Sequence, residues 1–180
     1  MELVSKKIVL KTHPFSVEEL ELTRDGAPVA HPYYRLDCAD WVNVLAVTTN
    51  RKAIMIRQAR PGSMRKVLET PGGMIDRHEK DATMAALREL EEETGFTSQR
   101  LLPLAVINPN PAIMTNRCHY FLALNCHLNP DRKHFPDPEE RIEVEIHDFA
   151  ALDQMVRTGE IDHSLSALCI MLAAKYLPAL

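Results

Sequence analysis

The sequence lacks the features that mark secreted, membrane-bound or zinc-binding proteins. Its four cysteines lie far apart and include no C-x-x-C pair, so we expect free thiols in a reducing compartment. The first thirteen residues lack the apolar run of a signal peptide. The longest apolar run, 167–174, is far shorter than the ~20 residues that a membrane span needs. We therefore expect a cytoplasmic protein with no membrane partner.

A net positive charge and two common enzyme motifs are also missing. The net charge is −4 with no run of Lys and Arg, so nucleic acid is not expected as the main partner. The eight histidines include no i,i+4 pair that would suggest zinc. No G-x-S-x-G elbow indicates a serine hydrolase.

The apolar pattern predicts strands and helices in a mixed order. Because this order shows no regular βαβ alternation, it favours an α+β fold, arranged as a layered α/β/α sandwich. A chain of 180 residues fits one domain with a short extension. The predicted strands are 7–12, 20–23, a run through Tyr33 and Tyr34, 41–48, 53–60, 101–108, 119–124 and 142–146, with a turn at Asp25-Gly26. Helices are predicted at 81–94, stopped by Gly95, at 148–158 and at 164–176, with a loop at 129–138.

Three carboxylates share one face of the predicted helix 81–94. Glu89, Glu92 and Glu93 are three or four residues apart or adjacent, so they project within about a third of the circumference. Hard oxygen ligands in such a cluster suit Mg²⁺ or Mn²⁺, and the ion removes their mutual repulsion. The alternative, a solvated acidic helix face, is the commoner origin of such a run. The preceding Gly72-Gly73 turn, which can bring backbone carbonyls close to an ion, favours the metal site.

The residues around these glutamates resemble the Nudix box, G-x5-E-x7-R-E-U-x-E-E-x-G-U, where U is aliphatic or aromatic. The chain matches it from Gly73 to Glu79 and at every specified position of 88–96. Eight residues rather than seven separate Glu79 from Arg88, and we expect the extra residue in the turn before the helix. The resemblance implies a Nudix sandwich and a metal-dependent pyrophosphohydrolase.

A wider resemblance points to one group within that family. Arg57-Gln58-Ala59-Arg60 and the run 68–73 are similar to the "R-Q-x-R … L-E-x-P-(A/G)-G" pattern of ADP-ribose pyrophosphatases and related sugar nucleotide hydrolases. The stretches 139–144 and 158–162 resemble that group's acidic loop and C-terminal ending. The resemblance implies that residues 1–40 form a β extension for homodimerisation and the nucleotide pocket, and that 41–180 form the catalytic domain.

The resemblance also implies roles for individual residues. The metal ligands for Mg²⁺, with Mn²⁺ able to substitute, would be Glu89, Glu92, Glu93 and the Gly72 carbonyl, with Glu93 the first choice. Glu139 or Glu140 of the acidic loop would deprotonate the attacking water; the alternative is an ordinary exposed loop pair. Arg60 would clamp a phosphate, or be only an exposed strand-edge charge. The further substrate-binding candidates are Glu69 and Tyr34, the latter stacking on the base unless it is a packing residue.

Substrate and activity leave alternatives open. ADP-ribose, giving AMP and ribose 5-phosphate, is the expected substrate. The group often has S-P-G-x-x-x-E after the box, whereas this chain has 108–116 reading NPNPAIMTN, so GDP-mannose or another sugar nucleotide stays open. One rival is a Nudix RNA or nucleoside triphosphate pyrophosphohydrolase. The other is a non-catalytic Nudix-fold ligand-binding protein, which the complete set of box glutamates opposes.

Overall fold

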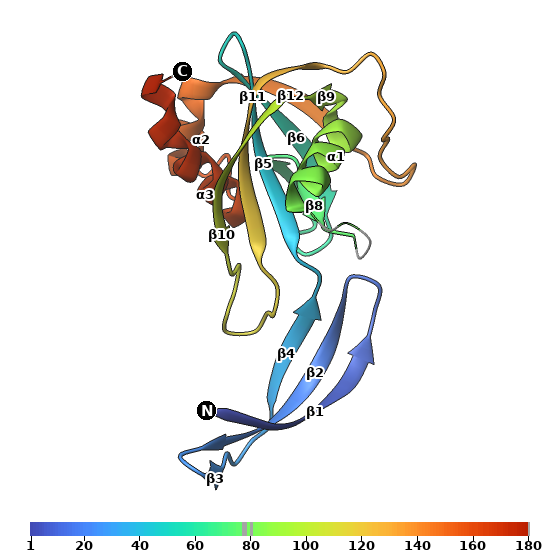
Figure 1. Cartoon of the computed structure of the whole chain (residues 1–180), viewed down its shortest axis with the longest axis vertical. Helices are drawn as coiled ribbons and strands as arrows, with labels where there is room; N and C mark the ends of the chain where they lie inside the picture. The colour runs from blue at the N-terminus through green and yellow to red at the C-terminus, as the bar shows by residue number, and fades with distance from the viewer. Residues whose placement is uncertain (77–78, 80, 180) are drawn as a thin grey trace. The chain divides into compact units, whose positions relative to one another are not determined.

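A computed structural model describes residues 1–76, 79 and 81–179 (Figure 1). The chain divides into two compact units, one formed by residues 1–40 with 107–118 and the other by residues 41–106 with 119–180. In the described part of the chain, no helix is long and apolar enough to cross a membrane. All four cysteines are free, as expected; three are buried and Cys38 is half-buried.

The first unit is built on a four-stranded antiparallel sheet. Its strands are β1 (Glu2–Lys11), β2 (Phe15–Arg24), β3 (Ala27–Pro28) and β4 (Tyr33–Cys38), and β2 pairs with each of the others. The predicted turn at Asp25 and Gly26 is confirmed, with both residues at positive φ. The segment 107–118 joins this unit through backbone hydrogen bonds between Leu36 and Ile113 (2.7 Å) and Leu36 and Thr115 (3.1 Å).

One buried ion-pair cluster ties three stretches of this sheet together. The carboxylate of Glu18 on β2 is 2 % exposed and accepts from Lys6 on β1 (2.7 Å) and Arg35 on β4 (2.8 Å). These two cations hold the pKa of Glu18 below its ordinary value. By contrast, every residue of β1 is exposed.

The second unit contains an eight-stranded sheet with the central order β10-β11-β5-β6-β12; β7 pairs with β6, β8 with β5 and β9 with β11. The strands are β5 (Trp41–Thr48), β6 (Lys52–Arg60), β7 (Arg65–Glu69), β8 (Gly72–Met74), β9 (Phe96–Thr97), β10 (Arg100–Ile107), β11 (Cys118–Leu128) and β12 (Glu143–Asp148). The helical elements are α1 (Ala82–Thr94), η1 (Phe149–Ala151), α2 (Leu152–Thr158), α3 (Ser164–Ala173) and η2 (Ala174–Ala179).

The alternation of β5 shows why helices cover both faces of this sheet. Val42, Val44 and Ala46 share a buried cluster with residues of α1, and alternate side chains of a strand point to opposite faces. Asn43, on the other face, meets the α3 side through Thr70 and Ser166. Figure 1 shows α2 and α3 on one side of the sheet and α1 on the other. The predicted α+β class is confirmed.

Helix α1 begins and ends where its flanking residues dictate. Asp81 is the N-cap, and its side chain accepts from the Thr83 amide (2.8 Å). The helix therefore begins at Ala82, one residue later than predicted. Gly95 ends the helix in the left-handed region at φ 77°, and its amide donates to Glu91. The predicted stop at Gly95 is therefore confirmed. These two ends fix the segment that carries the site.

Candidate active site

Arg88 organises the carboxylates that precede and follow it. Its Nη1 donates to Glu89 (2.9 Å) and, one turn on, to Glu92 (3.1 Å). Its Nε and Nη2 donate to the two oxygens of Glu79 (2.9 and 3.0 Å), and Nη2 also reaches the Met74 carbonyl (3.0 Å). This two-point pairing of guanidinium and carboxylate fixes both groups. The contact of Arg88 with Glu92 is the one that their i,i+4 spacing favours.

Glu79 keeps a defined place despite the longer spacing to Arg88. Besides binding Arg88, its Oε2 accepts from the Asp76 amide (2.9 Å). Part of the turn in which the extra residue was expected, namely 77, 78 and 80, lies outside the described residues. Glu79 thus contacts the helix that carries the other glutamates.

The double-glycine turn packs directly against two helix carboxylates. Glu93 is 9 % exposed, and its Oε2 accepts from the Gly72 amide (2.8 Å). A Cβ on Gly73 would lie only 2.5 Å from Oε1 of Glu89, and a Cβ on Gly72 would lie 2.3 Å from the Val42 carbonyl oxygen. Both glycines are therefore required by close approach, one to a side chain and the other to the backbone.

The two glycines should consequently respond differently to alanine. In Gly73→Ala the Glu89 carboxylate, the end of a flexible side chain, must move aside, so turnover should fall while the melting temperature changes little. In Gly72→Ala the backbone of β5 must move, and overpacking of this kind costs about 1–3 kcal/mol. Thermal unfolding and turnover of both variants test this. Full turnover in Gly73→Ala would show that the position of Glu89 is unimportant.

Burial makes the two inner carboxylates hard to ionise. Desolvation raises the pKa of Glu89 to about 7, opposed by Arg88 and reinforced by the charges of Glu92 and Glu140. Desolvation also raises the pKa of Glu93 well above 4.5, and the negative charge of Glu89 raises it further. Neighbouring carboxylates with raised pKa values indicate a site that is short of positive charge.

A divalent cation fits this deficit, and the carboxylates supply the hard oxygen ligands that it requires. The ligands are not already gathered: among the described residues, no three His, Cys, Asp or Glu side chains form a ready metal cluster. Glu89 and Glu92 are engaged by Arg88, and Glu93 by the Gly72 amide. Binding an ion would therefore exchange at least one of these hydrogen bonds for a metal–oxygen bond.

Arg60, the last residue of β6, and Glu69, the last residue of β7, form a two-point ion pair. Arg60 Nε and Nη2 donate to Glu69 at 2.8 and 2.6 Å. The Glu69 side chain is 2 % exposed, whereas that of Arg60 is 43 % exposed. Glu69 thus fixes two nitrogens of the guanidinium, while the Arg60 side chain stays exposed enough to meet an anion.

Behind this pair lies a buried polar network that the sequence did not indicate. The Nδ1 of His163 lies 2.9 Å from Ser166 Oγ and 3.5 Å from Glu69 Oε2. Ser166 also accepts from the Thr70 amide (3.0 Å). This is no Ser-His-acid triad, because serine and acid approach the same ring nitrogen and Ser166 is fully buried. The network joins α3 to Thr70, which lies just before the Gly72-Gly73 turn.

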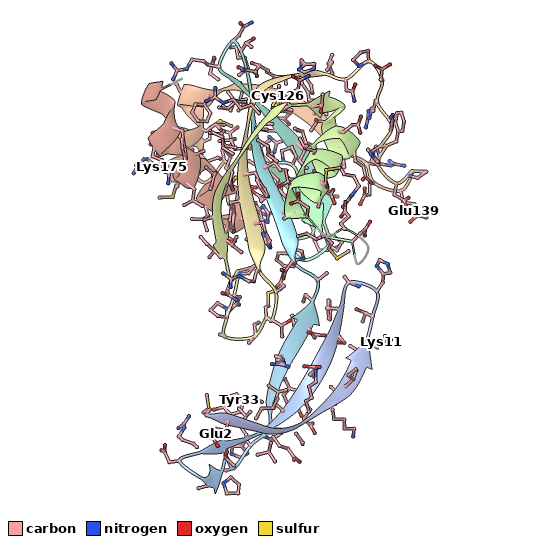
Figure 2. The ribbon with its side chains drawn as sticks, viewed as in Figure 1. Glu2, Lys11, Tyr33, Cys126, Glu139 and Lys175 are labelled. Atoms are coloured by element: carbon pink, nitrogen blue, oxygen red, sulfur yellow. The ribbon has the colours of Figure 1, made fainter. Side chains whose placement is uncertain are left out.

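The loop between β11 and β12 carries the two candidate bases, and Figure 2 labels Glu139 at its bend. Glu139 donates its amide to the Asp137 side chain (3.0 Å), and Glu140 donates its amide to the Asp137 carbonyl (2.8 Å). Both side chains are exposed. The charge of Glu140 helps to raise the pKa values of Glu89, Glu93 and Arg60. Glu140 is therefore electrostatically coupled to the inner carboxylates.

Tyr34 lies on β4 of the N-terminal unit. Its hydroxyl donates to Glu19 (2.7 Å), which raises the Tyr34 pKa, and the residue is 51 % exposed. An aromatic face that is half exposed with its hydroxyl already bound is available for stacking. Its role in binding a base stays a prediction.

Comparison with known proteins finds a matching family and relatives that are similar over nearly the whole chain. A NUDIX domain matches residues 40–167. An ADP-ribose pyrophosphatase of Bacillus subtilis (strain 168) is 32 % identical over 94 % of this chain and 93 % of its own. A GDP-mannose pyrophosphatase of Escherichia coli O1:K1 / APEC is 26 % identical over 93 % and 92 %. A crystal structure of an ADP compounds hydrolase has the same fold, with a TM-score of 0.83 and 20 % identity over 98 % and 94 %.

Proposed function

The chain belongs to the NUDIX family of hydrolases, and we propose that it cleaves the pyrophosphate bond of a nucleoside diphosphate sugar with a divalent metal ion, Mg²⁺ first. ADP-ribose is the proposed substrate, and water would convert it to AMP and ribose 5-phosphate. The proposal rests on the carboxylates of α1, of which Glu93 and Glu89 pack against the Gly72-Gly73 turn. The Bacillus relative, similar over nearly the full length of both chains, supports the choice of substrate.

Each part of the site has a task in this reaction. A bound divalent ion would neutralise phosphate charge and lower the pKa of the attacking water. Glu89, Glu92, Glu93 and the Gly72 carbonyl would hold it. Arg60, gripped by Glu69, would bind a phosphate oxygen through Nη1. These residues orient the pyrophosphate before any bond breaks.

Glu140 is the proposed general base, with Glu139 as the alternative. Glu140 would take the proton of the attacking water while the phosphorus–oxygen bond to the leaving phosphate breaks. Its electrostatic coupling to Glu89 and Glu93 supports this choice. Because Glu140 lies in the loop between β11 and β12, a shift of this loop would change the effect of its charge on Glu89 and Glu93.

Selectivity tests the proposal against its rivals. Turnover should be compared on ADP-ribose, GDP-mannose, UDP-glucose, dGTP and capped RNA, with products separated by chromatography. We expect AMP and ribose 5-phosphate from ADP-ribose to dominate. GMP and mannose 1-phosphate as the main products would keep the reaction but change the substrate. Cleavage confined to dGTP or RNA, or no cleavage at all, would contradict the proposal.

Residues 1–40 are proposed to form a homodimer through β1. Five large apolar side chains of this strand are 44–62 % exposed: Leu3, Val4, Ile8, Val9 and Leu10. Such an edge strand needs a cover, because its unpaired backbone and apolar side chains otherwise favour aggregation. A second copy of the chain supplies one, as the resemblance to dimeric sugar nucleotide hydrolases suggests.

Sedimentation at micromolar concentration checks the dimer. The wild-type chain should have twice the monomer mass, and Ile8→Lys should lower the mass towards that of the monomer without changing the fold. Lys7→Ala, on the neighbouring exposed position, serves as the control. A monomer mass for the wild type would contradict the proposal.

A further inference from the structure

The unspecified position between the box glutamates, Glu91, is buried rather than solvated. It is 8 % exposed, and its Oε1 accepts from Asn129 Nδ2 (2.5 Å) and the Lys133 amide (3.2 Å). Its Oε2 lies 3.6 Å from His134 Nε2. Helix α1 thus reaches, through one carboxylate, the loop that follows β11.

Two backbone contacts strengthen the same junction. The Asn129 amide donates to the Gly95 carbonyl (2.9 Å), and Arg132 Nη2 donates to the Glu92 carbonyl (2.6 Å). The guanidinium of Arg132 also lies 4.5 Å from the Phe135 ring centre. Carbonyls at the end of a helix lack helical partners and favour a cation. We call these contacts of residues 129–135 with the end of α1 the α1–loop clamp.

The clamp sets one end of the acidic segment 136–142. The other end is set where β12 begins, because Glu143 pairs with Arg57 on β6. Between them, the turn at Asp137 presents Glu139 and Glu140. Figure 1 shows this loop running from β11 past α1 to β12. Only seven residues therefore separate two fixed points of the catalytic unit.

We propose that the α1–loop clamp holds the acidic segment 136–142 at its working distance from the helix carboxylates, which makes Glu91 a positioning residue for Glu140. The inference rests on the proposed function, since it takes Glu140 as the base. One side of α1 holds the metal-binding candidates, and its buried Glu91 holds the loop. Glu92 takes part in both the candidate metal site and the clamp, because its carboxylate accepts from Arg88 while its backbone carbonyl accepts from Arg132.

A double-mutant cycle distinguishes positioning from a general structural role. Glu91→Ala should lower kcat about 10- to 100-fold, the scale expected for a misplaced catalytic group, with KM little changed. In a Glu140→Gln background the same change should cost nothing further, because there is no base left to position. Glu91→Gln keeps an oxygen for Asn129 and Lys133 and should retain most activity. Equal losses in both backgrounds would overturn the proposal.

Hydrogen exchange tests the clamp without any substrate. Glu91→Ala should speed exchange in 129–142 and leave that of β5 and β6 unchanged; Asn129→Ala, a loop variant that leaves the helix intact, should do the same. Lys133→Ala is the matched control, because its exposed side chain is removed while its amide still reaches Glu91. Unchanged exchange in both clamp variants would overturn the inference. A wild-type chain that cleaves no nucleotide would instead count against the proposed function alone.

Discussion

Glu93→Gln is expected to abolish most turnover while the protein stays folded. A metal ion contributes several kcal/mol of charge stabilisation in the transition state, so losing a ligand should lower kcat about a hundred- to ten-thousandfold. The amide oxygen of glutamine can still accept from the Gly72 amide, as Glu93 Oε2 does at 2.8 Å. The change therefore removes the charge and keeps the shape. Turnover with Mg²⁺ and thermal unfolding together measure the two effects.

Stability should not fall in this variant. The charged form of Glu93 is disfavoured by burial and by Glu89, so a neutral side chain should leave the melting temperature of the metal-free protein unchanged or higher. Glu160→Gln, on an exposed residue, is the control for the loss of one charge. Near-normal turnover in Glu93→Gln would remove Glu93 from the metal site.

Glu140→Gln should cost more than Glu139→Gln, although the two residues are adjacent. General base catalysis contributes about 10²–10⁴-fold, so the loss of the base should lower kcat by that order. The charge of Glu140 helps to raise the pKa values of Glu89, Glu93 and Arg60, which favours Glu140 as the base. The experiment compares kcat of the two variants at saturating metal and substrate.

Metal affinity provides the control for this comparison. Because neither loop residue is a proposed ligand, both variants should bind Mg²⁺ as the wild type does in calorimetry. A larger loss in Glu139→Gln would move the base to the neighbouring residue. Full activity in both variants would exclude the acidic segment from proton transfer.

Local sequence rules explain why α1 was predictable. The apolar stripe of Ala85, Ala86 and Leu90 is buried as its spacing requires, and Gly95 ends the helix by adopting positive φ. The carboxylate of Glu92 meets Arg88 because residues one turn apart are neighbours. Such contacts depend only on residues within two turns, so the sequence pattern contains them.

The rest of the site depends on contacts between distant segments. Glu91 occupies a position that the box leaves unspecified, yet it binds Asn129, 38 residues later. His163 and Ser166 join Glu69 and Thr70 from a helix nearly 100 residues away. The spacing of apolar and polar residues along each segment does not predict these pairings. They follow from how α1, α3 and the loop after β11 pack on the sheet. The joining of 107–118 to the N-terminal unit has the same origin.

The most direct test of the central claim is turnover of ADP-ribose by the wild-type chain, before and after removal of divalent ions with a chelator. We expect AMP and ribose 5-phosphate in equal amounts with Mg²⁺, no turnover with the chelator, and recovery when Mg²⁺ is restored. Undiminished turnover in the chelator, or intact ADP-ribose in the presence of Mg²⁺, would contradict it.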